Sequence, residues 1–299
     1  MPASLVLVFA LFGISFAGPL VRLSHAHPLA IAIWRLGFSL VIIAIALVAT
    51  GSWRQWRRLD RSGLLLAVGA GALLAIHFWT WNSSIGFTTV AASVVLVNTQ
   101  PVIVALLSAG WLHEPPSRRQ WLGIGVAMFG ALVVALPDME SAAHAATGRA
   151  LFGDALALVG AVTAACYFVA GRKLRATLDI WPYVAVVYGT CFVVLIALAA
   201  GVNAPVLHQP TRELAIFLAL AIGPMLLGHT GLNWALKYLP AYVVNLTLLG
   251  EPVGATLLAA ILPGIREVPG IATLGGGALI LAGISMTARA ARDSRPVAT

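Results

Sequence analysis

Long apolar runs separated by short polar clusters are the main pattern along this chain. Each run is roughly 18 residues or longer, which is about the length of helix that crosses a hydrocarbon layer ~30 Å thick. The runs predict ten transmembrane helices, at 4–23, 29–49, 63–84, 89–111, 120–136, 151–171, 180–200, 213–236, 240–262 and 268–288. They leave no room for a soluble domain, so the expected fold class is an all-α polytopic membrane protein.

The ninth run contains an unusual pair, Glu251 and Pro252, in the sequence "LLGEPVGATLL". A counterpart, "TQPV", lies in the fourth run, where Gln100 and Pro101 stand 151 residues earlier. Further positions repeat at this offset or at 153 residues, and they pair Asn82 with Asn233, Glu114 with Glu267, Gly123 with Gly276 and Gly130 with Gly283. The chain is therefore expected to contain an internal repeat.

The repeat predicts two five-helix halves, at about 1–140 and 150–290, followed by a cytoplasmic tail at 291–299. Because five is odd, the second half enters the membrane from the side opposite to the first. Inverted repeats of this kind usually frame a binding site near the membrane midplane. We therefore expect a central cavity between the halves.

Prolines within the runs are expected to interrupt helices. Pro101 and Pro252 lack the amide donor for the carbonyls of Val97 and Leu248, and irregular backbone is tolerated in a membrane where it is buried in protein or lines a cavity. The candidate hinges are Gly18, Pro19, Pro101 and Pro252. Fixed kinks are the alternative interpretation.

Polar side chains within the apolar runs mark the candidate substrate-binding residues. A carboxylate facing lipid at mid-membrane depth would cost roughly 2.5–3.5 kcal/mol on insertion scales, so we expect it to face inward. The candidates are His77, Trp81, Asn82, Gln100, Tyr167, Asn233 and Glu251. Aromatic surface would hold the substrate side chain, and polar groups would hold a zwitterion.

Each of these candidates also has a structural interpretation. Glu251 and Asn233 could form hydrogen bonds between helices, and His77 could bind a backbone carbonyl. Trp81 could belong to an interfacial aromatic belt. Arg35, about two turns into the second run, could bind a carboxylate or hold helix ends together.

Composition and charge agree with a membrane protein. Apolar residues make up 60% of the chain and charged residues 9%, with a formal charge of +8. Thirteen of the eighteen lysines and arginines fall on one side if the N-terminus is cytoplasmic, which explains the charge by orientation rather than by nucleic-acid binding. Cys166 and Cys191 lie within runs and have no metal or redox spacing, so no cofactor or metal is expected.

The two copies of a mid-helix proline, a glutamate at the helix end and spaced glycines resemble the repeat of the drug/metabolite transporter superfamily, EamA family. Those elements are Pro101, Glu114, Gly123 and Gly130, then Pro252, Glu267, Gly276 and Gly283. Within the family, the chain looks most like bacterial YddG-type exporters of aromatic and other neutral amino acids. The resemblance implies a basket of ten helices, cytoplasmic termini, alternating access and a bacterial inner-membrane location.

Other functions remain open at this point. A related exporter of another metabolite or drug class would have the same architecture. A non-transporting membrane subunit could use the glycine-lined fifth and tenth helices as an interface, and these faces also leave a homodimer open. An enzyme acting on a lipid-linked substrate is not expected, because the acidic residues form no recognisable constellation. The expected partners are a small-molecule substrate and membrane lipids.

Overall fold

The computed structural model describes residues 2–84, 86–88, 90–142, 148–261 and 270–293, and their regular structure is helical. Glu267 and the tail from residue 294 onward lie outside the described residues. The helices before the 143–147 gap are α1 (Ala3–Ser15), α2 (Ala17–Leu23), α3 (Pro28–Ala49), η1 (Ser52–Arg58), α4 (Arg61–Ser84), α5 (Val90–Val97), α6 (Gln100–Trp111) and α7 (Arg118–Ala142). Those after it are α8 (Gly148–Leu174), α9 (Ile180–Gly201), α10 (Thr211–Leu220), η3 (Ala221–Thr230), α11 (Gly231–Ala235), α12 (Ala241–Leu246), η4 (Thr247–Gly250), α13 (Glu251–Ile261) and α14 (Ile271–Asp293).

Within the described residues, eight helices are long and apolar enough to cross a membrane. They coincide with eight of the ten predicted runs. The fourth run contains a shorter apolar helical stretch, Val95–Trp111, which includes the break between α5 and α6. The ninth run is divided among α12, η4 and α13. Large apolar side chains on the spans face outward, such as Val48 and Leu151, each 72% exposed, as expected for contact with lipid. The chain is therefore a multi-pass membrane protein.

Helix interruptions occur just before the prolines that the sequence singled out. Phe16 separates α1 from α2 near Pro19, and residues 98–99 separate α5 from α6 near Pro101. Before Pro252, the backbone tightens into the 3₁₀ segment η4. In each case the proline lies in the first turn of the following helix, where its missing amide donor costs least.

A further irregularity lies in the eighth run and was not predicted. The backbone of η3 is a π-helix from Ala221 to Thr230, and Pro224 lies inside it. The Thr230 hydroxyl donates 3.2 Å to the carbonyl of Met225, five residues earlier. The signal was available in "AIGPMLLGHT", because a proline within a helix leaves a carbonyl unpaired and favours local rearrangement.

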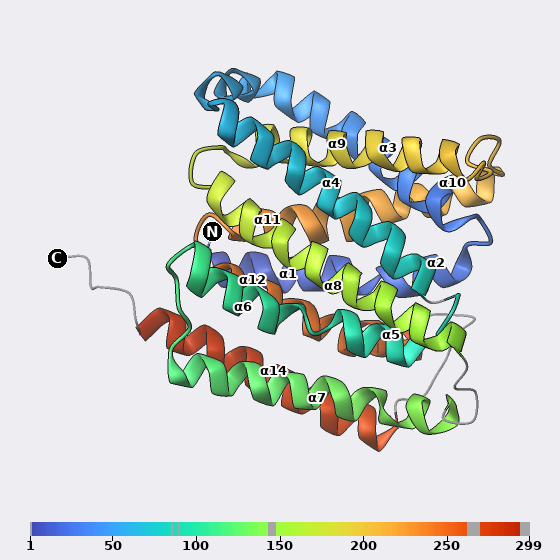
Figure 1. Ribbon diagram of the computed structural model, residues 1–299, viewed down its shortest axis with the longest axis vertical. Helices are drawn as coiled ribbons and strands as arrows, with labels where there is room; N and C mark the ends of the chain where they lie inside the picture. The colour runs from blue at the N-terminus through green and yellow to red at the C-terminus, as the bar shows by residue number, and fades with distance from the viewer. Residues whose placement is uncertain (1, 85, 89, 143–147, 262–269, 294–299) are drawn as a thin grey trace.

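The helices run roughly side by side in one bundle, with α7 and α14 forming a pair along one edge (Figure 1). Glycines allow close approach along this pair. A Cβ atom on Gly130 would lie 2.6 Å from the carbonyl oxygen of Gly276, and one on Gly123 would lie 2.8 Å from that of Gly283. The glycine faces of the fifth and tenth runs are thus occupied by a contact within the chain.

The interrupted helices lie next to one another inside the bundle. A Cβ on Gly254 of α13 would clash with the Ser15 side chain at the end of α1, and one on Gly250 would lie 2.8 Å from Leu11. Asn245 of α12 donates 3.3 Å to Gln100 at the start of α6. The breaks in three helices therefore converge in the protein interior, away from lipid.

Candidate functional site

One face of α4 carries a histidine and a tryptophan that pack against α8. His77 Nδ1 lies 2.9 Å from the carbonyl oxygen of Gly160, and its ring is parallel to Trp81 with centroids 6.2 Å apart. Since a carbonyl only accepts, this hydrogen bond assigns the proton to Nδ1 and leaves Nε2 as an acceptor. His77 therefore binds a backbone carbonyl, which is the structural role that the sequence left open for it. The same hydrogen bond fixes the orientation of the ring.

Arg35 lies on the other side of this aromatic group. Its side chain is only 7% exposed, and its guanidinium lies 4.0 Å from the centroid of the Phe78 ring. Phe78 in turn contacts His229 of η3 edge-on, with centroids 5.8 Å apart. A buried arginine that faces an aromatic ring is stabilised by a cation–π interaction, but its N–H donors also require partners.

Several polar atoms in this group lack a hydrogen-bond partner among the described residues. They are Arg35 Nε, Trp81 Nε1 and His229 Nδ1, and each is buried. A buried donor without a partner typically costs 1–3 kcal/mol, and more when it is charged. Three such atoms from three helices in one aromatic cluster are the strongest indication of a binding site among the described residues.

Glu251 supplies the opposite charge. It is the first residue of α13, where the helix resumes after η4, and it is partly buried. Its carboxylate interacts electrostatically with the Arg35 guanidinium. The first turn of a helix favours a carboxylate because the unpaired amides there carry partial positive charge. The break before Pro252 thus places Glu251 on the Arg35 side of the bundle.

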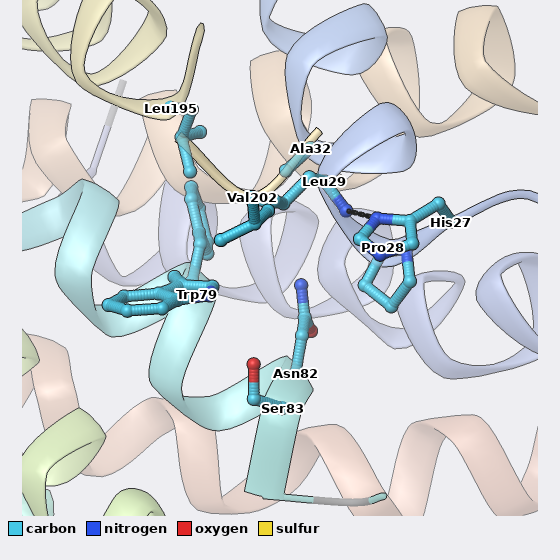
Figure 2. A pocket seen from close by; sticks show the side chains of 10 residues that line it. His27, Pro28, Leu29, Ala32, Trp79, Asn82, Ser83, Leu195 and Val202 are labelled. Carbon is cyan, nitrogen blue, oxygen red and sulfur yellow. Dashed lines mark hydrogen bonds between the residues drawn. The ribbon is translucent and has the colours of Figure 1, made fainter. Parts of the chain in front are cut away.

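Asn82 belongs to a separate cavity of about 170 Å³, shown in Figure 2. The cavity lies between the start of α3 and the ends of α4 and α9, and Trp79 and Ser83 also line it. His27 accepts a hydrogen bond from the amide of Leu29 at its rim, as the dashed line in Figure 2 shows. Phe78 lines this cavity too, so one ring connects it to Arg35.

Tyr167 and Asn233 lie together in a closed polar cluster. The Asn233 amide donates 2.5 Å to the Tyr167 hydroxyl and 3.1 Å to that of Tyr188, and its carbonyl accepts from Tyr183 at 3.4 Å. All four side chains are fully buried. The side-chain amide of Asn233 uses both its donor and its acceptor atom within this cluster. Asn233 therefore forms hydrogen bonds between helices, the structural role that the sequence left open for it.

Gln100, in the first half of the chain, has a hydrogen-bond partner in the second half. Its side chain is 8% exposed and accepts a hydrogen bond from the side-chain amide of Asn245. The side-chain oxygen of Asn245 is itself buried without a partner among the described residues. The seven predicted residues therefore form separate groups. His77 and Trp81 belong to the aromatic group whose Phe78 ring faces Arg35, and Glu251 lies at the start of α13. Tyr167 and Asn233 form the closed cluster, and Asn82 and Gln100 have other surroundings.

Sequence reasoning did not place Arg35 and His229 among the site residues. The available signal for Arg35 was a charge within an apolar run. For His229 it was the four-residue spacing of His229, Asn233 and Lys237, which places these polar side chains on one face of the eighth run. Within the described residues, no group of three histidine, cysteine, aspartate or glutamate side chains has a metal-binding arrangement.

The model of the EamA-like transporter family matches residues 1–136 and again 151–289. The chain belongs to this family. A transporter of Archaeoglobus fulgidus, described as uncharacterized, is 24% identical over 294 residues, which are 95% of this chain and 97% of the relative. The uncharacterized transporter YdfC of Bacillus subtilis is 22% identical over 283 residues, 94% of this chain and 88% of the relative.

A solved structure, described as "Crystal structure of protein", has a TM-score of 0.80 and covers 98% of this chain and 99% of its own. At 20% sequence identity, this similarity concerns the fold. The family model and the named relatives together make this chain a membrane transporter of the EamA family within the drug/metabolite superfamily.

Proposed function

We propose that this EamA transporter exports amino acids, aromatic and other neutral ones, across the bacterial inner membrane by alternating access. The observation that carries the proposal is the buried Arg35 guanidinium, which faces the Phe78 ring beside the parallel rings of His77 and Trp81 and whose Nε has no partner among the described residues. A substrate carboxylate is complementary to the Arg35 guanidinium, and the rings of Phe78, His77 and Trp81 offer aromatic surface for a flat side chain.

Arg35 binds the substrate carboxylate in this proposal, and Glu251 binds the ammonium group. The free Nε of Arg35 and the unpartnered nitrogens of Trp81 and His229 would then be satisfied by the bound molecule. Asn82 serves the cavity of Figure 2, through which the solute passes on one side of Phe78. Gln100, Tyr167 and Asn233 hold the helices around the site.

We further propose ten membrane crossings in two inverted halves, with interrupted helices as the fourth and ninth crossings. The glycine contacts between α7 and α14 support a two-fold relation. Gly123 meets Gly283, and Gly130 meets Gly276. In the repeat, Gly123 corresponds to Gly276 and Gly130 to Gly283, so the two contacts exchange under a two-fold axis.

Alternating access needs polar contacts that can open at either end of the bundle. At the end near the start of α3, the Ser24 hydroxyl donates 2.5 Å to Glu213. At the opposite end, Lys237 pairs with Asp179 at 2.9 Å. The cavity of Figure 2 lies at the Ser24 end, which the excess of basic residues elsewhere assigns to the outside.

The test is solute exchange in vesicles that contain only the purified protein. We expect uptake of labelled neutral amino acids in exchange for unlabelled ones. Arg35→Gln should raise the apparent Km roughly 10- to 100-fold, because a hydrogen bond to a charged group contributes about 1.5–3 kcal/mol. Arg35→Lys should recover part of the loss, and Arg119→Gln, an exposed arginine, is the matched control.

Glu251→Gln separates binding from proton coupling. If Glu251 carries protons, this variant loses the pH dependence of exchange, and an unchanged pH profile would remove it from coupling. Absence of flux for every amino acid, with flux for a sugar or a drug, would contradict the substrate assignment and favour another branch of the superfamily. Absence of any flux from the folded protein would favour the non-transporting subunit.

A further inference from the structure

A second cavity, of about 500 Å³, lies at the end of the bundle opposite to the cavity of Figure 2. Its walls come from η1, from the segment between α8 and α9, from the first turn of α9 and from the end of α11. These elements lie where spans end, since the spans Pro28–Ala49, Arg149–Leu174 and Thr211–Ala235 finish there and Ile180–Gly201 begins. The cavity is therefore at the depth of lipid headgroups.

The charge of this cavity is positive. Arg54, Arg58 and Arg175 line it, and the acidic residue among its walls is Asp179. Asp179 is already neutralised, because Lys237 Nζ lies 2.9 Å from one carboxylate oxygen and Gln55 donates 2.6 Å to the other. These two hydrogen bonds lower the pKa of Asp179, so the carboxylate stays ionised and bound to its partners.

Arg175 forms the inner wall of this cavity and makes its hydrogen bonds to backbone carbonyls. Its guanidinium donates to the backbone carbonyls of Asn233, at 3.1 Å, and of Leu178. The residue is 1% exposed, and burial lowers its pKa. Carbonyl groups satisfy the donors of arginine but carry no net charge, so the site favours an anion.

Aromatic rings form the remaining wall. Trp234 and Tyr238 lie with ring centroids 4.4 Å apart, and Trp181 lines the same cavity. Amphipathic rings of this kind are typical of the level between headgroup and acyl chain, where one edge is apolar and the other is wet. A soluble phosphate ester would use the arginines and gain nothing from this wall.

We propose that this cavity binds the phosphate group of an anionic phospholipid, with Arg54 and Arg58 as its direct charged contacts and the glycerol region against Trp181 and Trp234. A cluster of basic residues at the membrane surface attracts anionic lipid headgroups. Here, the two arginines belong to η1, which also contacts the second half through Gln55 and Asp179. Lipid bound at this point joins the two halves.

The experiment measures thermal unfolding of the detergent-purified protein with added short-chain phosphatidylglycerol. We expect a saturable rise in the midpoint, because a ligand that binds the folded form stabilises it. In the double variant R54Q/R58Q, this rise should fall to less than half. The matched control is R118Q/R119Q, which removes two exposed arginines from the first turn of α7 and should keep the full rise.

Further arms identify the source of the phosphate. Short-chain phosphatidylcholine should give a small rise that both double variants share. Equal loss in both double variants would reduce the effect to general attraction and overturn the site, as would an absent rise with phosphatidylglycerol. An equal rise with glycerol phosphate or inorganic phosphate would overturn the lipid assignment. None of these arms depends on transport, so this site and the proposed transport function can fail independently.

Discussion

Arg35 illustrates how one buried charge organises its surroundings. Removing a guanidinium from water costs several kcal/mol, and the cation–π contact with Phe78 offsets only part of this cost. A substrate carboxylate paired with the guanidinium would offset more of it. A site that binds a zwitterion between two fixed charges gains specificity, because an uncharged analogue leaves both of them unpaired.

Asp179 gives a prediction about pH, because it lies outside the spans and joins three segments of the chain. Its pKa is lowered by hydrogen bonds from Lys237 and Gln55. A lowered pKa means that the stabilisation is present above the unfolded value, roughly 3.9, and is lost as the pH falls through the folded value. The contact should therefore be unaffected between about pH 5 and pH 8.

The measurement compares the unfolding midpoints of the wild type and Asp179→Asn across this range. The side chains of Lys237 and Asp179 are 36% and 53% exposed, so the difference should be small, roughly 0–1 kcal/mol. It should stay constant from pH 8 to pH 5 and shrink below pH 4. A difference that grows toward acid pH would contradict the assignment.

Helix pairs in this protein depend on small residues more than on apolar attraction, since lipid is as apolar as a leucine side chain. The α7–α14 pair shows this most clearly, because the glycines of one helix face the backbone of the other.

Glu114, just after α6, also joins helices, but through an ion pair. Its carboxylate pairs with Arg172 of α8 at 2.7 Å, and Arg172 also donates 2.6 Å to the carbonyl of Leu236.

Gly130→Val should separate α7 from α14. A Cβ at this position would lie 2.6 Å from the Gly276 carbonyl oxygen, which is backbone and cannot move aside easily. Overpacking of this kind typically costs 1–3 kcal/mol. The control is Gly125→Val on the same helix, where no neighbour lies within 4 Å of the added atom. Equal unfolding midpoints for the two variants would show that the pair is looser than described.

For the molecule as a whole, the relative orientation of the two halves is the property on which the proposed mechanism depends. The offset of 151 residues makes His25 equivalent to Ala176, and Ser52 equivalent to Asn203, the neighbour of Val202. Inverted halves place each member of these pairs on opposite sides of the membrane. Parallel halves would place both members on the same side.

Labelling of single cysteines tests this orientation in intact cells, after Cys166 and Cys191 have been replaced by alanine. A membrane-impermeant thiol reagent should label His25→Cys and Val202→Cys, but label Ala176→Cys and Ser52→Cys only after the membrane is opened. All four positions lie in connections between helices or at helix ends. Labelling of His25→Cys and Ala176→Cys from the same side would contradict the inverted arrangement.

The properties of this protein that are local along the chain follow from its sequence alone. The lengths of the apolar runs determined which segments are helical and long enough to span a membrane, because the bilayer requires each such segment to satisfy its own backbone hydrogen bonds. The family resemblance was likewise readable from repeated prolines and glycines, and the family match confirms it at the level of EamA transporters. The helix interruptions near Pro19, Pro101 and Pro252 could also be predicted, because proline lacks a backbone N–H donor in any tertiary structure.

Only the tertiary structure decided which polar residues meet. Helical periodicity places a side chain on a face, but it does not say which helix lies opposite, and contacts such as Arg35 with Phe78 or Asn233 with Tyr167 join residues far apart in the chain. The same limit explains why Arg35 and His229 were left outside the predicted site, while Tyr167 and Asn233 were grouped with Glu251. Burial and hydrogen-bond partners depend on packing between helices, and packing is a property of the folded bundle.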